Sequence, residues 1–127
     1  MQQTHLFEYA VVRVVPRVER EEFLNVGVIL YCAKLNFLQT RYRLNEERLR
    51  IFCDQVDKTE LLNNLQAFER ICVGGKDAGP IGLLPTPERF RWLTATRSTI
   101  LQTSKVHPGF SSNPQETLDR LYTQLVL

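Results

Sequence analysis

The stretch that most constrains the fold is LFEYAVVRVV, residues 6–15, which places apolar side chains on both of its alternating faces. Its β-branched and aromatic residues favour a strand, and successive side chains of a strand point to opposite faces. The pattern predicts a central strand covered on both sides; the alternative is one covered face with aromatic residues at its rim. Pro16 ends the strand, because proline has no N–H to donate to a neighbouring strand.

Two further strand-like runs, at about residues 25–33 and 37–44, predict a β-hairpin around a short polar connection. Two helices are expected after it. Asn45 and Asp57 are suited to cap their first turns, and apolar residues recur at helical spacing between residues 61 and 72. Gly74 is then expected to end the second helix.

The last third of the chain predicts shorter elements. Residues 74–85 are rich in glycine and proline and predict a surface loop, after which Thr86 and Pro87 fit the start of a short helix. The alternative there is a strand, since arginines alternate with aromatic residues at positions 89–92. Residues 98–106 predict an edge strand, and Asn113 is suited to cap an amphipathic C-terminal helix.

This order of elements is typical of an α+β fold rather than an alternating parallel fold. We expect residues 1–127 to form a single domain, which contains an antiparallel sheet of about four strands. Three or four helices are expected to pack on one face or at one end of that sheet. The longest apolar run, residues 26–31, is far shorter than the ~20 residues needed to cross a bilayer, so we expect no membrane segment.

The cysteines bear on compartment and on metal binding. Cys32, Cys53 and Cys72 are odd in number and contain no C-x-x-C pair, which fits buried thiols in a reducing compartment. The amino terminus lacks the basic and apolar regions of a signal peptide, so we expect a cytoplasmic protein. His5 and His107 provide no metal-ligand spacing, and we expect neither a metal nor a cofactor.

The choice of cation is unusual, because the chain has twelve arginines and four lysines at a net charge of only +2. Genomic base composition is one explanation. The other is local binding, since the guanidinium fork suits carboxylates and phosphates. The candidate anion-binding surface comprises Arg13, Arg17, Asn25, Arg89, Arg91, Arg97, Ser98, Thr99 and His107. If the two parts of the sequence that hold them meet in the sheet, one basic pocket results; the alternative is pairing with neighbouring glutamates.

Three residues have other interpretations. Trp92 beside arginines could stack nucleic-acid bases, but we expect it to pack in the core between helix and sheet. Glu22 and His107 are weak candidates for a general acid and base, although no nucleophile motif or carboxylate pair accompanies them. Gly27 follows Asn25 at the start of a strand, where glycine usually marks a bulge or a close backbone approach.

Two blocks carry a family resemblance. Residues 9–32, YAVVRVVPRVEREEFLNVGVILYC, and residues 89–109, RFRWLTATRSTILQTSKVHPG, resemble the bacterial family catalogued as domain of unknown function 3037. Its patterns R-V-V-P-R-x-E-R-x-E-x-x-N-V-G and R-F-R-W-L-T-A-x-R-S-T match residues 13–27 and 89–99, and the family often has proline in place of Thr96. The resemblance implies no activity. It implies a partner, because members tend to be encoded beside a kinase-like protein that resembles the HipA type.

Together these features predict a small cytoplasmic accessory domain that acts by binding rather than by catalysis. Its Arg- and hydroxyl-rich surface is expected to bind a protein partner, such as the HipA-type kinase, or a phosphate-bearing ligand. The alternative is a hydrolase or transferase acting on nucleotides or nucleic acid through Glu22 and His107. A third interpretation makes the C-terminal helix or the edge strand at residues 98–106 the seam of a homodimer.

Overall fold

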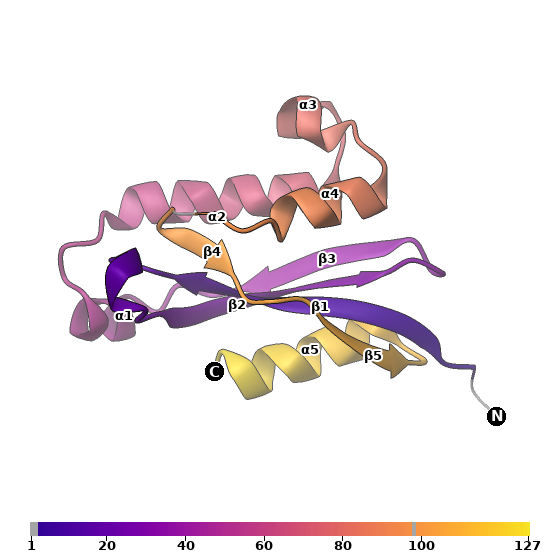
Figure 1. The fold of residues 1–127 in the computed structure, drawn as a ribbon, viewed down its shortest axis with the longest axis horizontal. Helices are drawn as coiled ribbons and strands as arrows, with labels where there is room; N and C mark the ends of the chain where they lie inside the picture. The colour runs from indigo at the N-terminus through magenta and orange to yellow at the C-terminus, as the bar shows by residue number, and fades with distance from the viewer. Residues whose placement is uncertain (1–2, 98) are drawn as a thin grey trace.

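A computed structural model describes residues 3–97 and 99–127 of the chain. Its strands form one antiparallel sheet in which β1 lies between β2 on one side and both β4 and β5 on the other, while β3 pairs with β2 (Figure 1). The strands are β1 (His5–Val14), β2 (Leu24–Cys32), β3 (Phe37–Tyr42), β4 (Leu101–Thr103) and β5 (His107–Ser111). The predicted hairpin is β2 and β3.

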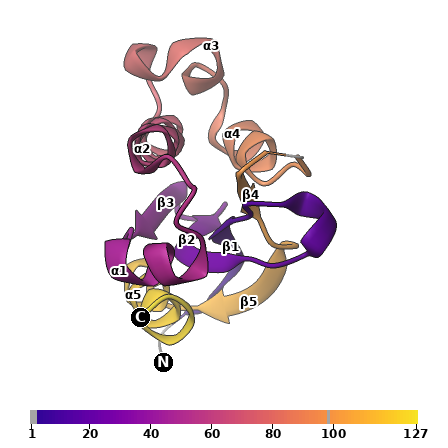
Figure 2. The same ribbon diagram turned by 90° about the vertical axis from the view of Figure 1, so that its left-hand side faces the viewer.

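The helices divide between the two faces of this sheet. Figure 2 shows α2 and α4 above one face and α5 against the other. The predicted α+β class is confirmed, whereas the expectation that the helices pack on one face or at one end of the sheet is corrected, because both faces of the central strands are apolar and each requires a cover. The helical elements are α1 (Glu46–Phe52), α2 (Lys58–Val73), α3 (Gly79–Gly82), α4 (Thr86–Leu93) and α5 (Pro114–Leu125), with 3-10 turns η1 (Val18–Arg20) and η2 (Lys76–Ala78).

Two hydrophobic cores result from this arrangement. Val12 and Val14 of β1 pack in the core beneath α2 and α4, whereas Phe7 of the same strand packs in the core beneath α5. On β2 the neighbours Ile29 and Leu30 point to opposite faces and are both 0% exposed. The central strands are therefore covered on both sides, as the apolar pattern of residues 6–15 predicts.

The predicted helix caps are confirmed. The side-chain oxygens of Asn45, Asp57 and Asn113 accept hydrogen bonds from backbone N–H groups three residues later, at 2.9, 3.1 and 3.2 Å. Each cap satisfies one of the N–H groups that a first helical turn leaves without a partner. Residues 86–93 form the helix α4 rather than the alternative strand, with Pro87 in the first turn.

The last third of the chain departs from the prediction in three places. The expected loop at residues 74–85 contains η2 and α3. The edge strand expected at residues 98–106 is shorter and comprises only β4. The strand β5 was not predicted, because its sequence HPGFS holds two residues that disfavour strands. Its Gly109 lies against Phe7, where an added Cβ would stand 2.5 Å from the tip of the ring, so a larger residue there would require the Phe7 side chain to move.

The pairing of β1 with β2 contains the irregularity expected at Asn25–Gly27. The register shifts between Val12 and Arg13, so that Val12 pairs with Gly27 and Arg13 pairs with Asn25. A Cβ at Gly27 would stand 2.8 Å from the Cβ of Tyr42 on β3. The glycine thus permits the close approach of β3, and the bulge places Arg13 and Asn25 side by side on one face.

The described residues contain no helix that is long and apolar enough to cross a membrane. Over the same residues, no three His, Cys, Asp or Glu side chains gather as a metal site would require.

Candidate functional site

The two arginine-containing blocks of the sequence meet in the sheet. Arg13 of β1 pairs with Gln102 of β4, and Tyr9 pairs with His107 of β5. Val12 and Val14 point toward α2 and α4, so Arg13 points to the opposite face of the sheet. Arg97, in contrast, lines a cavity with residues of α2. The expectation of one shared basic pocket is therefore corrected: the blocks are adjacent, but Arg13 and Arg97 point to different surfaces.

Arg13 lies beside an aromatic ring and an amide. Its guanidinium stands 3.8 Å from the ring centre of Phe23, and burial lowers its pKa. The Asn25 side chain donates to the carbonyl of Leu125 at the end of α5, over 3.2 Å. Arg13 Nε and Asn25 Oδ1 are both buried without a hydrogen-bond partner among the described residues.

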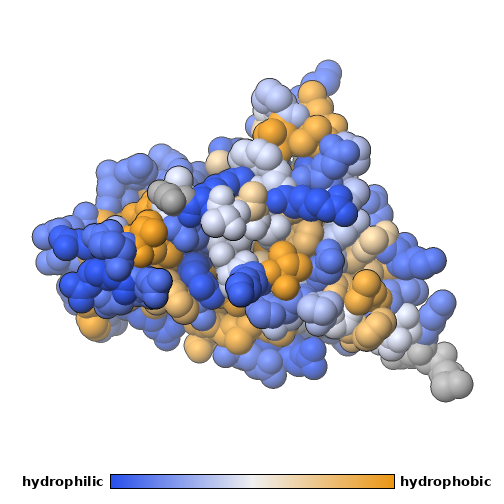
Figure 3. All heavy atoms as spheres, viewed as in Figure 1, coloured by the Kyte–Doolittle hydropathy of each residue, from blue (hydrophilic) through white to orange (hydrophobic). Residues whose placement is uncertain are grey.

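The segment between β1 and β2 forms one wall of a cavity of about 330 Å³, which we call the Arg17 cavity. Its other wall is the end of α1 and the connection to α2. The lining residues are Pro16, Arg17, Arg20 and Glu22 on the first wall and Phe52, Cys53, Asp54 and Gln55 on the second. Hydrophilic residues gather over this end of the molecule, at the left of Figure 3.

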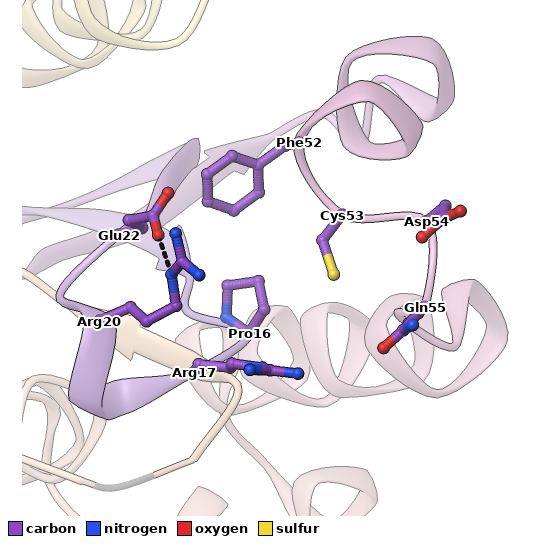
Figure 4. A pocket seen from close by; sticks show the side chains of 8 residues that line it. All are labelled: Pro16, Arg17, Arg20, Glu22, Phe52, Cys53, Asp54 and Gln55. Atoms are coloured by element: carbon purple, nitrogen blue, oxygen red, sulfur yellow. Dashed lines mark hydrogen bonds and ion pairs between the residues drawn. The ribbon is translucent and has the colours of Figure 1, made fainter.

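The charges of the Arg17 cavity are unequally compensated (Figure 4). Arg20 forms an ion pair with Glu22, and the two side chains lie side by side near Phe52. The side chain of Arg17 extends toward Gln55 and forms no ion pair or hydrogen bond with the described residues, and the thiol of Cys53 points into the same space. The cavity therefore presents one guanidinium that has no ion-pair partner among the described residues, next to the amide of Gln55 and the thiol of Cys53, and the carboxylate of Asp54 also lines it without pairing to Arg17.

Trp92 and Arg97 build a second cavity, of about 260 Å³, which we call the Trp92 pocket. The Arg97 guanidinium stands 4.0 Å from the Trp92 ring centre and donates to the Trp92 carbonyl. Trp92 is 39% exposed, so the expectation that it packs in the core is wrong. The helix α4 turns Phe90 and Leu93 into the core, and this leaves Trp92 at the surface between them.

Arg89 has a structural role. Its guanidinium donates to the carbonyls of Ile71, Cys72 and Leu84 at 2.8, 2.7 and 3.0 Å, and to the hydroxyl of Thr86 at 3.0 Å. Carbonyls in the last turn of a helix lack partners within the helix, so Arg89 caps the C-terminal end of α2. These bonds use the donors that a ligand would need.

The remaining predicted site residues are dispersed. Arg91 is exposed on α4, and the Thr99 hydroxyl donates to the carbonyl of Leu101. Ser98 lies outside the described residues. The imidazole of His107 contacts the ring of Tyr9, with 5.3 Å between ring centres.

Glu22 and His107 do not form an acid–base pair. His107 is opposite Tyr9, and Asn25 is opposite Arg13, four residues further along β1, which is ~13 Å at ~3.3 Å per residue. Glu22 lies beyond Asn25 in the connection that precedes β2. The two side chains are therefore too far apart to act as general acid and base on the same bond of a substrate.

Sequence reasoning missed one wall of the Arg17 cavity. Cys53 and Gln55 follow α1, more than thirty residues after Arg17, and nothing in their local sequence indicates a cavity. Phe23 carried a signal, since a single aromatic residue within the charged run VEREEF has no core position to occupy. It is 46% exposed beneath Arg13.

Comparison with known proteins gives one match. The family model described as "Protein of unknown function (DUF3037)" matches residues 9–126, a range that contains both arginine blocks and both cavities. No curated protein and no solved structure matched the chain. Because the family model spans nearly the whole sequence, the chain belongs to the DUF3037 family of unknown function.

Proposed function

We propose that this protein is a binding module, in which the Arg17 cavity holds an anionic group of a protein partner. The observation that carries the proposal is the unpaired cation. Arg17 points into a cavity of about 330 Å³ without an acidic partner among the described residues, whereas Arg20 beside it is neutralised by Glu22. A guanidinium held in a concave site is suited to a carboxylate or phosphate, which it binds with two parallel hydrogen bonds.

Apolar residues next to the cavity favour a protein partner over a free ion. Val18 and Phe23 are 47% and 46% exposed; Val18 lies between Arg17 and Arg20, and Phe23 directly follows Glu22. Arginine and aromatic residues are enriched at the energetic centres of protein interfaces. The HipA-type kinase that the family resemblance implies is the first partner to test. A phosphate-bearing ligand is the second, because the same fork accepts it.

The contribution of Arg17 to the binding free energy follows from the charge of its hydrogen bond. A hydrogen bond to a charged group contributes about 1.5–3 kcal/mol, which corresponds to roughly 10- to 100-fold in dissociation constant. Reversal of the charge at Arg17 removes this bond and adds repulsion. Since the side chain of Arg17 forms no ion pair or hydrogen bond with the described residues, its replacement is expected to change binding and not stability.

The experiment measures binding of the kinase-like protein by isothermal titration calorimetry. We compare the wild type, Arg17→Glu, and the control Lys34→Glu, which changes the net charge equally in the exposed turn between β2 and β3. Arg17→Glu is expected to weaken binding at least tenfold while the melting temperature stays within about 2 °C. Inorganic phosphate is titrated in parallel.

Two results would contradict the proposal. Equal weakening by Lys34→Glu would show that net charge, rather than the cavity, determines binding. Wild-type affinity of Arg17→Glu for both the kinase-like protein and phosphate would remove the Arg17 cavity as the site.

A further inference from the structure

The Trp92 pocket has a lining different from that of the Arg17 cavity. Its floor is apolar and includes Phe68 and Ile71 of α2 and Leu93 of α4. Among the described residues that line it, Arg97 is the only charged one, and Asn64 and Thr99 are the polar ones beside it. The Arg17 cavity contains two acids, whereas the Trp92 pocket combines an apolar floor with one uncompensated positive charge.

The guanidinium of Arg97 is held in place but not neutralised. One face lies on the Trp92 ring, and one terminal nitrogen donates to the Trp92 carbonyl. Arg97 forms no ion pair with the described residues, it is partly buried, and this burial lowers its pKa. Its other donors have no hydrogen-bond partner among the described residues, and a carboxylate could accept from them in a charge-assisted pair.

The volume of the pocket limits its occupant. Sites for cofactors and drug-sized ligands measure ~300–1,000 Å³, whereas this pocket measures about 260 Å³. It can hold one amino-acid side chain. A half-exposed tryptophan and an arginine at its rim are also the residue types that dominate binding at protein interfaces.

We propose that the Trp92 pocket binds the C-terminal residue of a protein partner. Its apolar side chain lies against Phe68, Ile71 and Leu93, and its α-carboxylate accepts hydrogen bonds from Arg97. Because Arg97 itself lines the pocket, the carboxylate must lie within a few ångströms of the apolar group. The C-terminal residue of a chain carries both groups on one Cα, whereas adjacent internal residues of an extended segment point to opposite sides.

This assignment does not depend on the proposed role of Arg17. The two cavities share no lining residue, and they are formed by different connections of the chain. A failure at one site leaves the other unaffected.

The test uses the fluorescence of Trp92, which is the only tryptophan of the chain. Three N-acetylated tetrapeptides are titrated into the full-length protein: one ending in leucine with a free carboxylate, its C-terminal amide, and a free acid ending in glycine. We expect saturable change with the leucine acid below about 1 mM, and at least tenfold weaker binding of the other two. Arg97→Gln is expected to remove the preference for acid over amide.

Isovalerate, which presents a leucine-like group and a carboxylate without a peptide, identifies the source of the ligand. Weaker binding of isovalerate than of the leucine peptide supports a protein terminus, and equal or tighter binding overturns it. Equal binding of the acid and the amide, or no saturable response to the leucine acid, also overturns the proposal. These comparisons use the wild-type protein, so they hold whether or not Arg97→Gln folds.

Discussion

Arg89 provides the most direct test of how this chain uses its arginines. The side chain donates four hydrogen bonds, two of them to the carbonyls of Ile71 and Cys72 in the last turn of α2, eighteen and seventeen residues earlier in the sequence. We predict that Arg89→Ala destabilises the fold, because these carbonyls lose their partner. Arg89→Lys is expected to recover only part of the loss, since a single ammonium group cannot reproduce the fork.

The magnitude follows from the bonds. Four hydrogen bonds at a net value of about 1 kcal/mol each contribute about 4 kcal/mol to the free energy of unfolding. Alanine has no side-chain entropy to lose on folding, and this offsets about 1 kcal/mol of the loss. The expected loss is about 3 kcal/mol of unfolding free energy. For a domain of this size, that corresponds to a fall of roughly 10 °C in melting temperature.

The assay is thermal and urea unfolding followed by circular dichroism, with Arg91→Ala as the matched control. Arg91 is exposed on the same helix and its side chain forms no hydrogen bond or ion pair with the described residues, so its replacement by alanine is expected to cost less than about 0.5 kcal/mol. If Arg89→Ala melted within about 2 °C of the wild type, the capping role would be refuted. Loss of ligand binding at unchanged stability would instead support the ligand role predicted from the sequence.

Two further predictions concern stability. Gly27→Ala is expected to cost about 1–3 kcal/mol in urea unfolding, because the added Cβ would stand 2.8 Å from the Cβ of Tyr42 and 2.9 Å from the carbonyl oxygen of Arg41; a midpoint equal to wild type would contradict this close approach. Burial, the main cause, raises the pKa of the Cys72 thiol to about 12 from 9.0. The unfolded chain therefore releases this proton first as the pH rises, and stability falls between about pH 9 and pH 12. From pH 8 to pH 10 the wild type should lose about 1.4 kcal/mol more than Cys72→Ala, and parallel losses would exclude the thiol as the cause.

Local features of the sequence determined most of the secondary structure. Asn45, Asp57 and Asn113 were identified as caps from the sequence, because a cap requires only a short polar side chain and an N–H group three residues away. The two-sided apolar pattern of residues 6–15 likewise predicted the burial of β1 on both faces. The strand β5 was missed, because its pairing with β1 and the contact of Gly109 with Phe7 outweigh the low strand propensity of HPGFS.

The sequence by itself thus determined the hairpin and the helix ends, since each depends on neighbours within a few residues. The order of these elements then indicated the fold class, and the arginine-rich composition can be read directly from the sequence. Only the tertiary structure decided what individual arginines do. Arg89 donates to a carbonyl at the end of α2, and Arg97 lies on the ring of Trp92. Arg17 points into a cavity whose second wall is formed by residues 52–55. These outcomes depend on the packing of α4 against α2 and on where the ends of β1 and α1 meet, and long-range contacts of this kind leave no periodic or spacing signal in a sequence.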